Sequence, residues 1–161
     1  MKKIIDVCCG SRMFWFDKQN QNVEFCDIRQ EEHILCDGRK LIIKPDTIAD
    51  FRKLPFEDNS YNLVVFDPPH LVKLGKNSWM AKKYGVLNEN WKDDIQRGFK
   101  ECWRVCKKDG VIIFKWNQRD IKISEIIKAI DKQPLFGHTT TASGNTIWMC
   151  FMKDLSTPSK E

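Results

Sequence analysis

Residues 62–66 limit the fold of this chain more than any other feature of its sequence. Leu63-Val64-Val65-Phe66 is continuously apolar and lacks the alternation of a strand with one face in water. Such a run is expected for a strand that is buried on both faces of a parallel sheet. It ends at Asp67-Pro68-Pro69, because proline lacks the N–H that an inner strand uses. The sequence therefore predicts a central strand with a rigid turn at its carboxyl end.

Strand-like and helix-like patterns alternate along the rest of the chain. Apolar residues recur at helical spacing over residues 91–106 and 121–130. The other expected strands cover residues 3–8, 23–28, 47–51, 111–116, 135–141 and 146–152. This alternation predicts an open α/β fold with a mostly parallel, seven-stranded sheet, helices on both faces and a C-terminal antiparallel hairpin.

The expected organisation is a single domain over residues 1–153, followed by a flexible polar tail over residues 154–161. Asp37-Gly38 stands between two apolar runs, so residues 31–45 are expected to form a β-hairpin insertion. Residues 71–90 show no clear period, and a loop of that length inside a compact domain is usually functional. We expect this segment to be a mobile lid.

The composition is that of an ordinary globular protein, with 42% hydrophobic and 30% charged residues in a chain of 161. No apolar run approaches the ~20 residues that cross a bilayer, and Asp6 interrupts the apolar start too early for a signal peptide. The seven cysteines form no C-x-x-C pair, which fits a reducing compartment. We therefore expect a cytoplasmic protein without membrane contact or a metal. Metal binding by Cys102 and Cys106 is a weaker alternative to core packing.

Asp67-Pro68-Pro69-His70 carries the sharpest chemical signal. The prolines leave the Pro68 carbonyl pointing outward beside the Asp67 carboxylate. Two oxygen acceptors on a rigid turn hold an exocyclic NH2 group by both hydrogens, which draws the nitrogen lone pair out of the ring plane toward an electrophile. His70 would stack on a flat base or accept a proton. The alternative is an ordinary proline-rich turn.

Three further signals follow strands that are expected to end at the same sheet edge. Asp6-Val7-Cys8-Cys9-Gly10-Ser11 has one glycine, where a ligand can approach the backbone, and lacks the glycine pattern of a pyrophosphate site. Asp27 is placed where an acidic residue holds ribose hydroxyls in nucleoside-binding α/β folds. Asp50 and Phe51 offer a carboxylate for an adenine amine and a ring for its face. Taken alone, each signal also fits an ordinary turn or core residue.

These motifs, in this order, resemble those of class I S-adenosylmethionine-dependent methyltransferases, and the resemblance extends over residues 3–152. Cys9-Gly10-Ser11 and Asp67-Pro68-Pro69-His70, with histidine in the aromatic place, are similar to the amino-methylating, adenine-N6-like subgroup of small phage or bacterial type. The resemblance implies a Rossmann-like sheet, S-adenosyl-L-methionine as cofactor and methyl transfer to an amino nitrogen, as in DNA methylation.

The resemblance also implies roles for particular residues. The catalytic residues would be Asp67, Pro68, Pro69 and His70. The cofactor would be bound by Asp6, Cys8, Gly10, Asp27, Ile28, Asp50 and Phe51.

The segment after the catalytic motif bears on the substrate. Residues 71–92 hold five lysines against one acidic residue, with aromatic residues between them. Because lysines neutralise phosphates and rings stack on exposed bases, this pattern favours nucleic-acid binding beside an amine site. The candidate substrate-binding residues are Lys73, Lys76, Trp79, Lys82, Lys83 and Tyr84. A solvated loop whose rings pack on the body is the alternative.

Two features depart from the family pattern. Arg12 stands where a second glycine is usual, so the cofactor loop is expected to have a different shape. A separate target-recognition domain is not expected, which leaves room for a recognition subunit, a structured RNA or relaxed specificity. Three functions stay open: an adenine-N6 methyltransferase of DNA or RNA, a methyltransferase of another base or small-molecule amine, and a non-catalytic module. His33, His138 and Lys115-Trp116-Asn117 have no assigned role.

Overall fold

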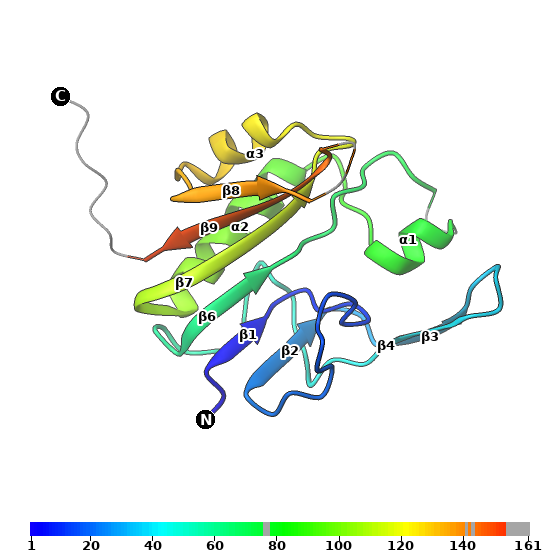
Figure 1. Ribbon diagram of the computed structural model, residues 1–161, viewed down its shortest axis with the longest axis horizontal. Helices are drawn as coiled ribbons and strands as arrows, with labels where there is room; N and C mark the ends of the chain where they lie inside the picture. Colours follow the sequence, from blue (N-terminus) through cyan, green and yellow to red (C-terminus); the bar gives the residue numbers. More distant parts are fainter. Residues whose placement is uncertain (76–77, 141, 143, 154–161) are drawn as a thin grey trace.

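The computed structural model describes residues 1–75, 78–140, 142 and 144–153. Its main sheet has seven strands in the order β5-β2-β1-β6-β7-β9-β8 (Figure 1). The strands are β1 (Ile4–Asp6), β2 (Val23–Asp27), β5 (Thr47–Ile48), β6 (Tyr61–Phe66), β7 (Cys106–Asn117), β8 (Phe136–Thr139) and β9 (Thr146–Met152). The pairings from β5 to β7 are parallel, whereas β9 runs antiparallel to both β7 and β8. The predicted fold class is confirmed.

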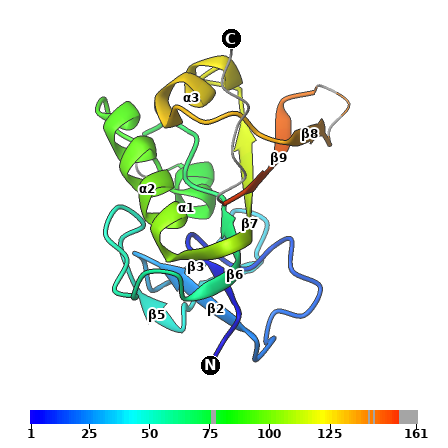
Figure 2. The same ribbon diagram turned by 90° about the vertical axis from the view of Figure 1, so that its left-hand side faces the viewer.

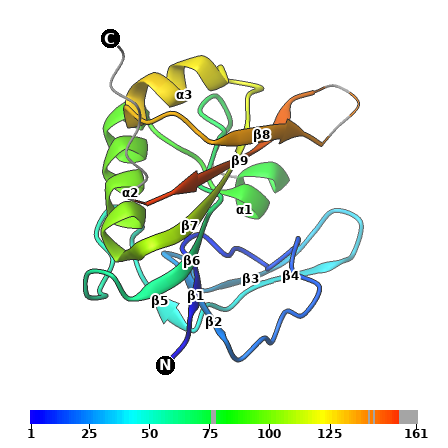
Figure 3. The same ribbon diagram turned by 60° about the vertical axis from the view of Figure 1, so that its left-hand side comes forward.

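The longer helices α2 (Trp91–Val105) and α3 (Ile123–Ile130) lie together on one face of the sheet (Figures 2 and 3). Their apolar sides join the inward residues of the central strands in the larger of two hydrophobic clusters. Gly98 allows α2 to approach the sheet closely, because a Cβ there would lie 2.4 Å from the ring of Phe51 and 2.9 Å from that of Phe66. This contact fixes the position of Phe51.

The opposite face of β1 and β2 is covered by residues 7–22, a segment with turns and no helix. The indole of Trp15 packs edge-on against Phe25 of β2, with ring centroids 5.2 Å apart. Phe14 makes a similar edge contact with Trp148 of β9, at 5.4 Å. Aromatic rings of an irregular segment therefore provide the apolar cover on this face.

Two short elements stand apart from the sheet, beyond the carboxyl ends of its parallel strands (Figure 1). Strands β3 (Glu31–Ile34) and β4 (Lys40–Ile43) form a separate antiparallel hairpin. Helix α1 (Trp79–Tyr84) lies in the segment that showed no period in the sequence. Ser78 caps its first turn by accepting a hydrogen bond from the amide of Ala81, and Gly85 ends it at a φ of +74°.

One boundary differs clearly from the sequence prediction. Helix α2 ends at Val105 and β7 begins at Cys106, although the sequence predicted that the strand would begin only at residue 111. Tyr61 of β6 pairs with Cys106, and the register then shifts so that Leu63 pairs with Val111. Pairing with β6 therefore draws residues 106–110 into the strand. Within the part of the chain that is described, no helix has the length and apolarity to cross a bilayer.

Candidate active site

The carboxyl ends of β1 and β6 lie side by side at the point where the strand order reverses. Asp6, the last residue of β1, pairs with Val65 of β6, and Asp67 comes directly after that strand. Open α/β sheets bind ligands in the crevice at such a switch point. Two cavities of about 30 Å³ and 50 Å³ lie here, and Asp67 lines both of them.

The first cavity brings the glycine turn after β1 together with the predicted catalytic motif. Cys8, Gly10, Asp67, Pro68 and His70 all line it. Gly10 has a φ of +50°, in the region that side chains rarely adopt, and no atom lies within 4 Å of the place where its Cβ would be. The backbone at this turn is therefore open to a ligand.

The second cavity gathers residues predicted to bind the nucleoside part of a cofactor. Asp27, Ile28, Phe51 and Pro69 line it. The buried Asp27 carboxylate accepts a hydrogen bond from the Gly10 amide at 2.9 Å through Oδ2. Its Oδ1 accepts from the backbone amide and the guanidinium of Arg29. Asp27 thus links the two cavities and, of the roughly four acceptor positions of a carboxylate, keeps one on Oδ2 for a ligand.

Two predicted cofactor residues line neither cavity. Asp6 is fully buried, and its carboxylate accepts hydrogen bonds from the Trp15 indole at 2.7 Å and from the Cys8 amide at 3.2 Å. Burial raises its pKa to about 7, although the Trp15 hydrogen bond opposes this effect. The Asp50 carboxylate forms an ion pair with Arg52 instead, and Nη2 of Arg52 lies 2.7 Å from Oδ2 of Asp50. Arg52 also pairs with Asp94 of α2. In this arrangement, Asp6 stabilises the glycine turn through the Cys8 amide. Asp50, just after β5, is connected to α2 through Arg52.

The side chain of Arg12 points away from the first cavity, which it does not line. Its guanidinium lies 3.8 Å from the centroid of the Phe25 ring and donates hydrogen bonds to the carbonyls of Lys18 and Lys44. Its φ of +57° is the left-handed conformation that glycine favours. Arg12 therefore has a backbone conformation that glycine also favours, and its side chain lies outside the first cavity.

The two predicted oxygen acceptors of the catalytic motif have different surroundings. Among the described residues, no donor is hydrogen-bonded to the Pro68 carbonyl. The Asp67 carboxylate accepts a hydrogen bond from the Lys115 ammonium at 2.7 Å. Burial raises the pKa of Asp67, and the nearby Lys115 charge opposes this rise.

Sequence reasoning gave no role to Lys115, which is a central residue of this site. It projects from β7, whose register with β6 brings it to Asp67 across 48 positions of sequence. Its ammonium also lies over the rings of Phe14 and Trp148, at 5.3 Å and 5.6 Å from their centroids. The sequence feature that could have identified this residue is a lone lysine within the apolar run Val111-Ile112-Ile113-Phe114-Lys115-Trp116. An unpaired charge would be costly in such a run, so a partner is expected.

His70 is surrounded by rings, with centroid distances of 5.6 Å to Tyr84 and 6.3 Å to Trp116. Burial lowers its pKa to about 4, and the Lys115 charge adds to this effect. The imidazole is therefore neutral at pH 7 and a weak base. Its surroundings favour stacking on a flat ligand over proton abstraction.

Helix α1 closes the two cavities. Tyr84 lines both of them, and Lys83 lines the first. Arg29 connects this helix to β2, because its Nη1 donates to the carbonyl of Lys82 at 2.8 Å while its Nε donates to Asp27. Gly85 packs closely on Pro69, where a Cβ would lie 3.1 Å from the proline ring.

The remaining predicted substrate residues lie away from the cavities or outside the described structure. Lys73 is exposed, and its backbone amide donates a hydrogen bond to Oδ2 of Asp120 at 3.4 Å. Trp79 is 48% exposed on α1, with the Lys83 ammonium 5.9 Å from its ring centroid. Lys76 lies outside the described residues.

The chain matches no known protein family and no curated protein in sequence, but its fold has solved relatives. PH0226 from Pyrococcus horikoshii superposes with a TM-score of 0.56 at 14% identity, over 94% of this chain and 81% of that one. A TehB-like SAM-dependent methyltransferase from Corynebacterium glutamicum superposes with a TM-score of 0.55 at 11% identity, over 94% of this chain and 80% of that one.

A third relative is the 1,6-didemethyltoxoflavin-N1-methyltransferase of Burkholderia thailandensis, solved with 1,6-didemethyltoxoflavin and S-adenosylhomocysteine. It gives a TM-score of 0.52 at 10% identity, over 94% of this chain and 72% of that one. At these identities the likeness establishes the fold. The chain has the Rossmann-like fold that is found in SAM-dependent methyltransferases.

Proposed function

We propose that this protein is an S-adenosylmethionine-dependent methyltransferase that methylates an exocyclic amino nitrogen, with N6 of adenine in DNA or RNA as its target. One observation carries the proposal. Asp67 and Pro68 line the same cavity as the open backbone turn at Gly10. An amine held by these oxygens would lie beside the place where a sulfonium would be bound.

The side chains present fit the proposed cofactor. Asp27 offers a buried carboxylate for ribose hydroxyls, Phe51 offers a ring for adenine, and the turn at Gly10 leaves room for the methionine end. When bound, the cofactor would supply an electrophilic methyl group. The cavities, at about 30 Å³ and 50 Å³, are smaller than the roughly 300–1,000 Å³ of typical ligand sites. Binding therefore requires these cavities to widen, and α1, which supplies Lys83 and Tyr84, is the covering element whose displacement would widen both.

The mechanism assigns distinct tasks to the residues around the first cavity. Asp67 and Pro68 would accept the two amine hydrogens and so orient the nitrogen lone pair toward the methyl group. Lys115 favours the ionised form of Asp67, the form that accepts. Neutral His70 and Tyr84 would stack on the flat ring that carries the amine and exclude water. The proton released from nitrogen would pass to water or to Asp67.

A second candidate substrate is the amine of a small flat heterocycle. It is favoured by the Burkholderia structure, whose enzyme is named for methylation at N1 of 1,6-didemethyltoxoflavin. A non-catalytic module would be favoured if the Arg12 side chain filled the cofactor turn, but this side chain lies outside the first cavity.

The decisive experiment offers the protein labelled S-adenosylmethionine with DNA, RNA and a pool of small heterocyclic amines. Mass spectrometry of the digested products then identifies the methylated nucleoside or compound. We expect N6-methyladenine, and a loss of about 100-fold or more in rate for Asp67→Ala with cofactor binding retained. Methylation confined to small molecules would reject the nucleic-acid target. Equal rates for Asp67→Ala would reject the amine site.

A further inference from the structure

A cleft of about 680 Å³ lies between the loop of residues 10–19 and the β3–β4 hairpin. It is separate from the two small cavities but adjoins the first of them, since Gly10, Ser11, Met13 and Lys83 line both spaces. Apolar side chains of the hairpin, including Leu35, contribute to its walls. The mechanism above makes no use of this cleft.

The cleft is strongly cationic. Six basic side chains line it against the single carboxylate of Asp46, namely those of Arg12, Lys18, Arg39, Lys40, Lys44 and Lys83. Asp46 is already neutralised, because it pairs with Lys2 at 2.7 Å and with Arg12 at 3.0 Å. The cleft therefore has a clear excess of positive charge.

Some of these basic side chains form ion pairs with carboxylates, and others do not. Arg39 and Lys40 pair with acidic neighbours on the hairpin, Asp37 and Glu32. Lys18 and Lys44 are exposed, and neither ammonium lies within 4 Å of a carboxylate among the residues described, although the Lys44 charge acts on Glu32 at longer range. The Lys83 ammonium contacts only rings in the described structure, at 5.1 Å from the centroid of Tyr84. Lys18, Lys44 and Lys83 are thus available to an anionic ligand.

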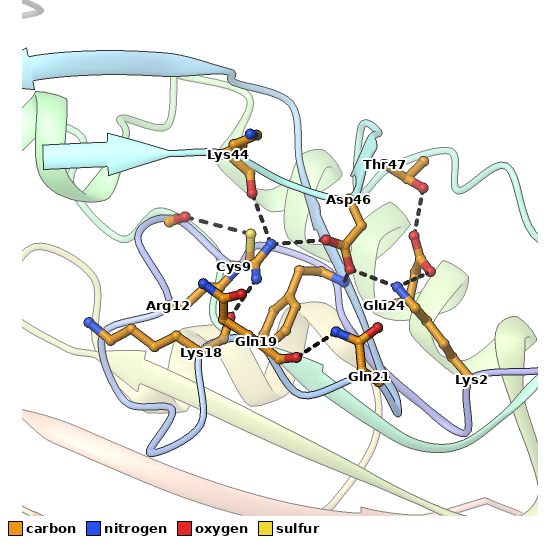
Figure 4. Close-up of polar contacts among 12 residues, drawn as sticks. Lys2, Cys9, Arg12, Lys18, Gln19, Gln21, Glu24, Lys44, Asp46 and Thr47 are labelled. Atoms are coloured by element: carbon orange, nitrogen blue, oxygen red, sulfur yellow. Dashed lines mark hydrogen bonds and ion pairs between the residues drawn. The ribbon is translucent and has the colours of Figure 1, made fainter.

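Arg12 connects two backbone segments that line the cleft (Figure 4). Its guanidinium donates hydrogen bonds to the carbonyl of Lys18 through Nη1, and to the carbonyl of Lys44 and the carboxylate of Asp46 through Nη2. Stacking on Phe25 anchors this guanidinium to β2. The two free lysines are therefore attached to backbone segments that Arg12 ties together, which limits the cost of ordering them around a ligand.

We propose that this cleft, named here the hairpin cleft, binds the sugar–phosphate backbone of the nucleic-acid strand that flanks the target base. The inference rests on the proposed function and specifies its substrate as a strand rather than a free heterocycle. A base extruded into the first cavity would leave its neighbouring phosphates at the shared border formed by Ser11 and Lys83. The continuing strand would then meet Lys18 and Lys44, and its sugars would contact the apolar walls.

The test measures binding of a fluorescent single-stranded oligonucleotide by anisotropy across a range of salt concentrations. The double variant Lys18→Glu/Lys44→Glu is compared with Lys108→Glu/Lys128→Glu, which changes the net charge equally at two exposed lysines outside the cleft. We expect the cleft variant to bind at least about tenfold more weakly at low salt. Its log–log salt slope should fall in magnitude by about 1.4, since each phosphate of a single strand that a lysine no longer neutralises lowers the slope by about 0.7. The control variant should bind like the wild type.

Equal losses in both double variants would overturn the inference, because only net charge would then matter. Absence of oligonucleotide binding by the wild type would overturn it as well. Lys18→Ala/Lys44→Ala repeats the test without introducing acidic groups, and the thermal unfolding midpoint of each variant reports whether it is folded.

Methyl transfer to a free heterocycle, measured on the same samples, separates this inference from the proposed function. If the cleft variants keep that activity while strand binding falls, the inference stands. If the wild type transfers no methyl group to any acceptor but still binds the strand through Lys18 and Lys44, the proposed function fails and the cleft assignment survives.

Discussion

The Nζ atom of Lys115 lies 2.7 Å from Oδ2 of Asp67, and both side chains are about one-fifth exposed. This ion pair joins neighbouring strands at the site where an amine is proposed to bind. Burial raises the pKa of Asp67 and so favours its protonated form, whereas Lys115 lowers this pKa and favours the charged form. The lysine is therefore expected to set the pH range in which the carboxylate can accept an amine hydrogen.

Lys115→Met should shift the acidic limb of the pH–rate profile toward higher pH. The substitution removes the two interactions that lower the pKa of Asp67, so the carboxylate would ionise only at a higher pH. The loss of kcat/KM relative to the wild type should be larger at about pH 6 than at about pH 9. Lys108→Met, at an exposed position, is the control. An unchanged profile would show that Lys115 acts only in packing.

Asp6→Asn should remove a pH-dependent part of the free energy of unfolding. The native pKa of Asp6 is raised from 3.8 to about 7, so between these values the folded protein binds a proton that the unfolded chain has released. The wild type therefore loses stability as pH rises through this window, by at most about 1.4 kcal/mol per pH unit, and Asp6→Asn should not. Urea unfolding at several pH values measures the difference. Asp17→Asn, at an exposed site, should follow the wild type.

Gly98→Ala should destabilise the protein and weaken cofactor binding together. The new methyl group would meet the ring of Phe51 at 2.4 Å, and Phe66 behind it leaves little room to yield. Overpacking of this kind costs about 1–3 kcal/mol, against about 1 kcal/mol gained in helix propensity. Gly75→Ala, outside any helix, is the control without overpacking, since nothing lies within 4 Å of the added carbon. Thermal unfolding and calorimetry with S-adenosylmethionine give the two readouts. Tighter cofactor binding in Gly98→Ala would contradict the placement of Phe51.

Arg12→Ala should be less stable than Arg12→Gly, by about 1 kcal/mol. Both variants lose the stacking on Phe25 and the hydrogen bonds to Lys18 and Lys44. Only glycine, however, adopts the φ of +57° without strain. Chemical denaturation measures the difference. Because the side chain does not line the first cavity, cofactor affinity should be similar in the two variants, and a large loss in both would place Arg12 in the cofactor site.

Local sequence patterns identified the elements that build the switch point. The apolar run of β6 and its two prolines were predictable because each signal lies within a few residues. Helix α1 was not predicted, since six residues are too few to show a period, although Ser78 and Gly85 mark its ends. Lys115 and the hairpin cleft depend on contacts between distant segments, which no window of the sequence contains.

Arg29 has a consequence for the order in which ligands arrive. The same guanidinium binds Asp27 at the end of β2 and the last turn of α1. Because only Oδ2 of Asp27 has an open acceptor position, a second ribose hydroxyl would compete with Arg29 for Oδ1 and would loosen the link between β2 and the helix that covers the cavities. Loading of the cofactor and admission of the acceptor would then be coupled through one carboxylate oxygen, which would make binding sequential instead of random.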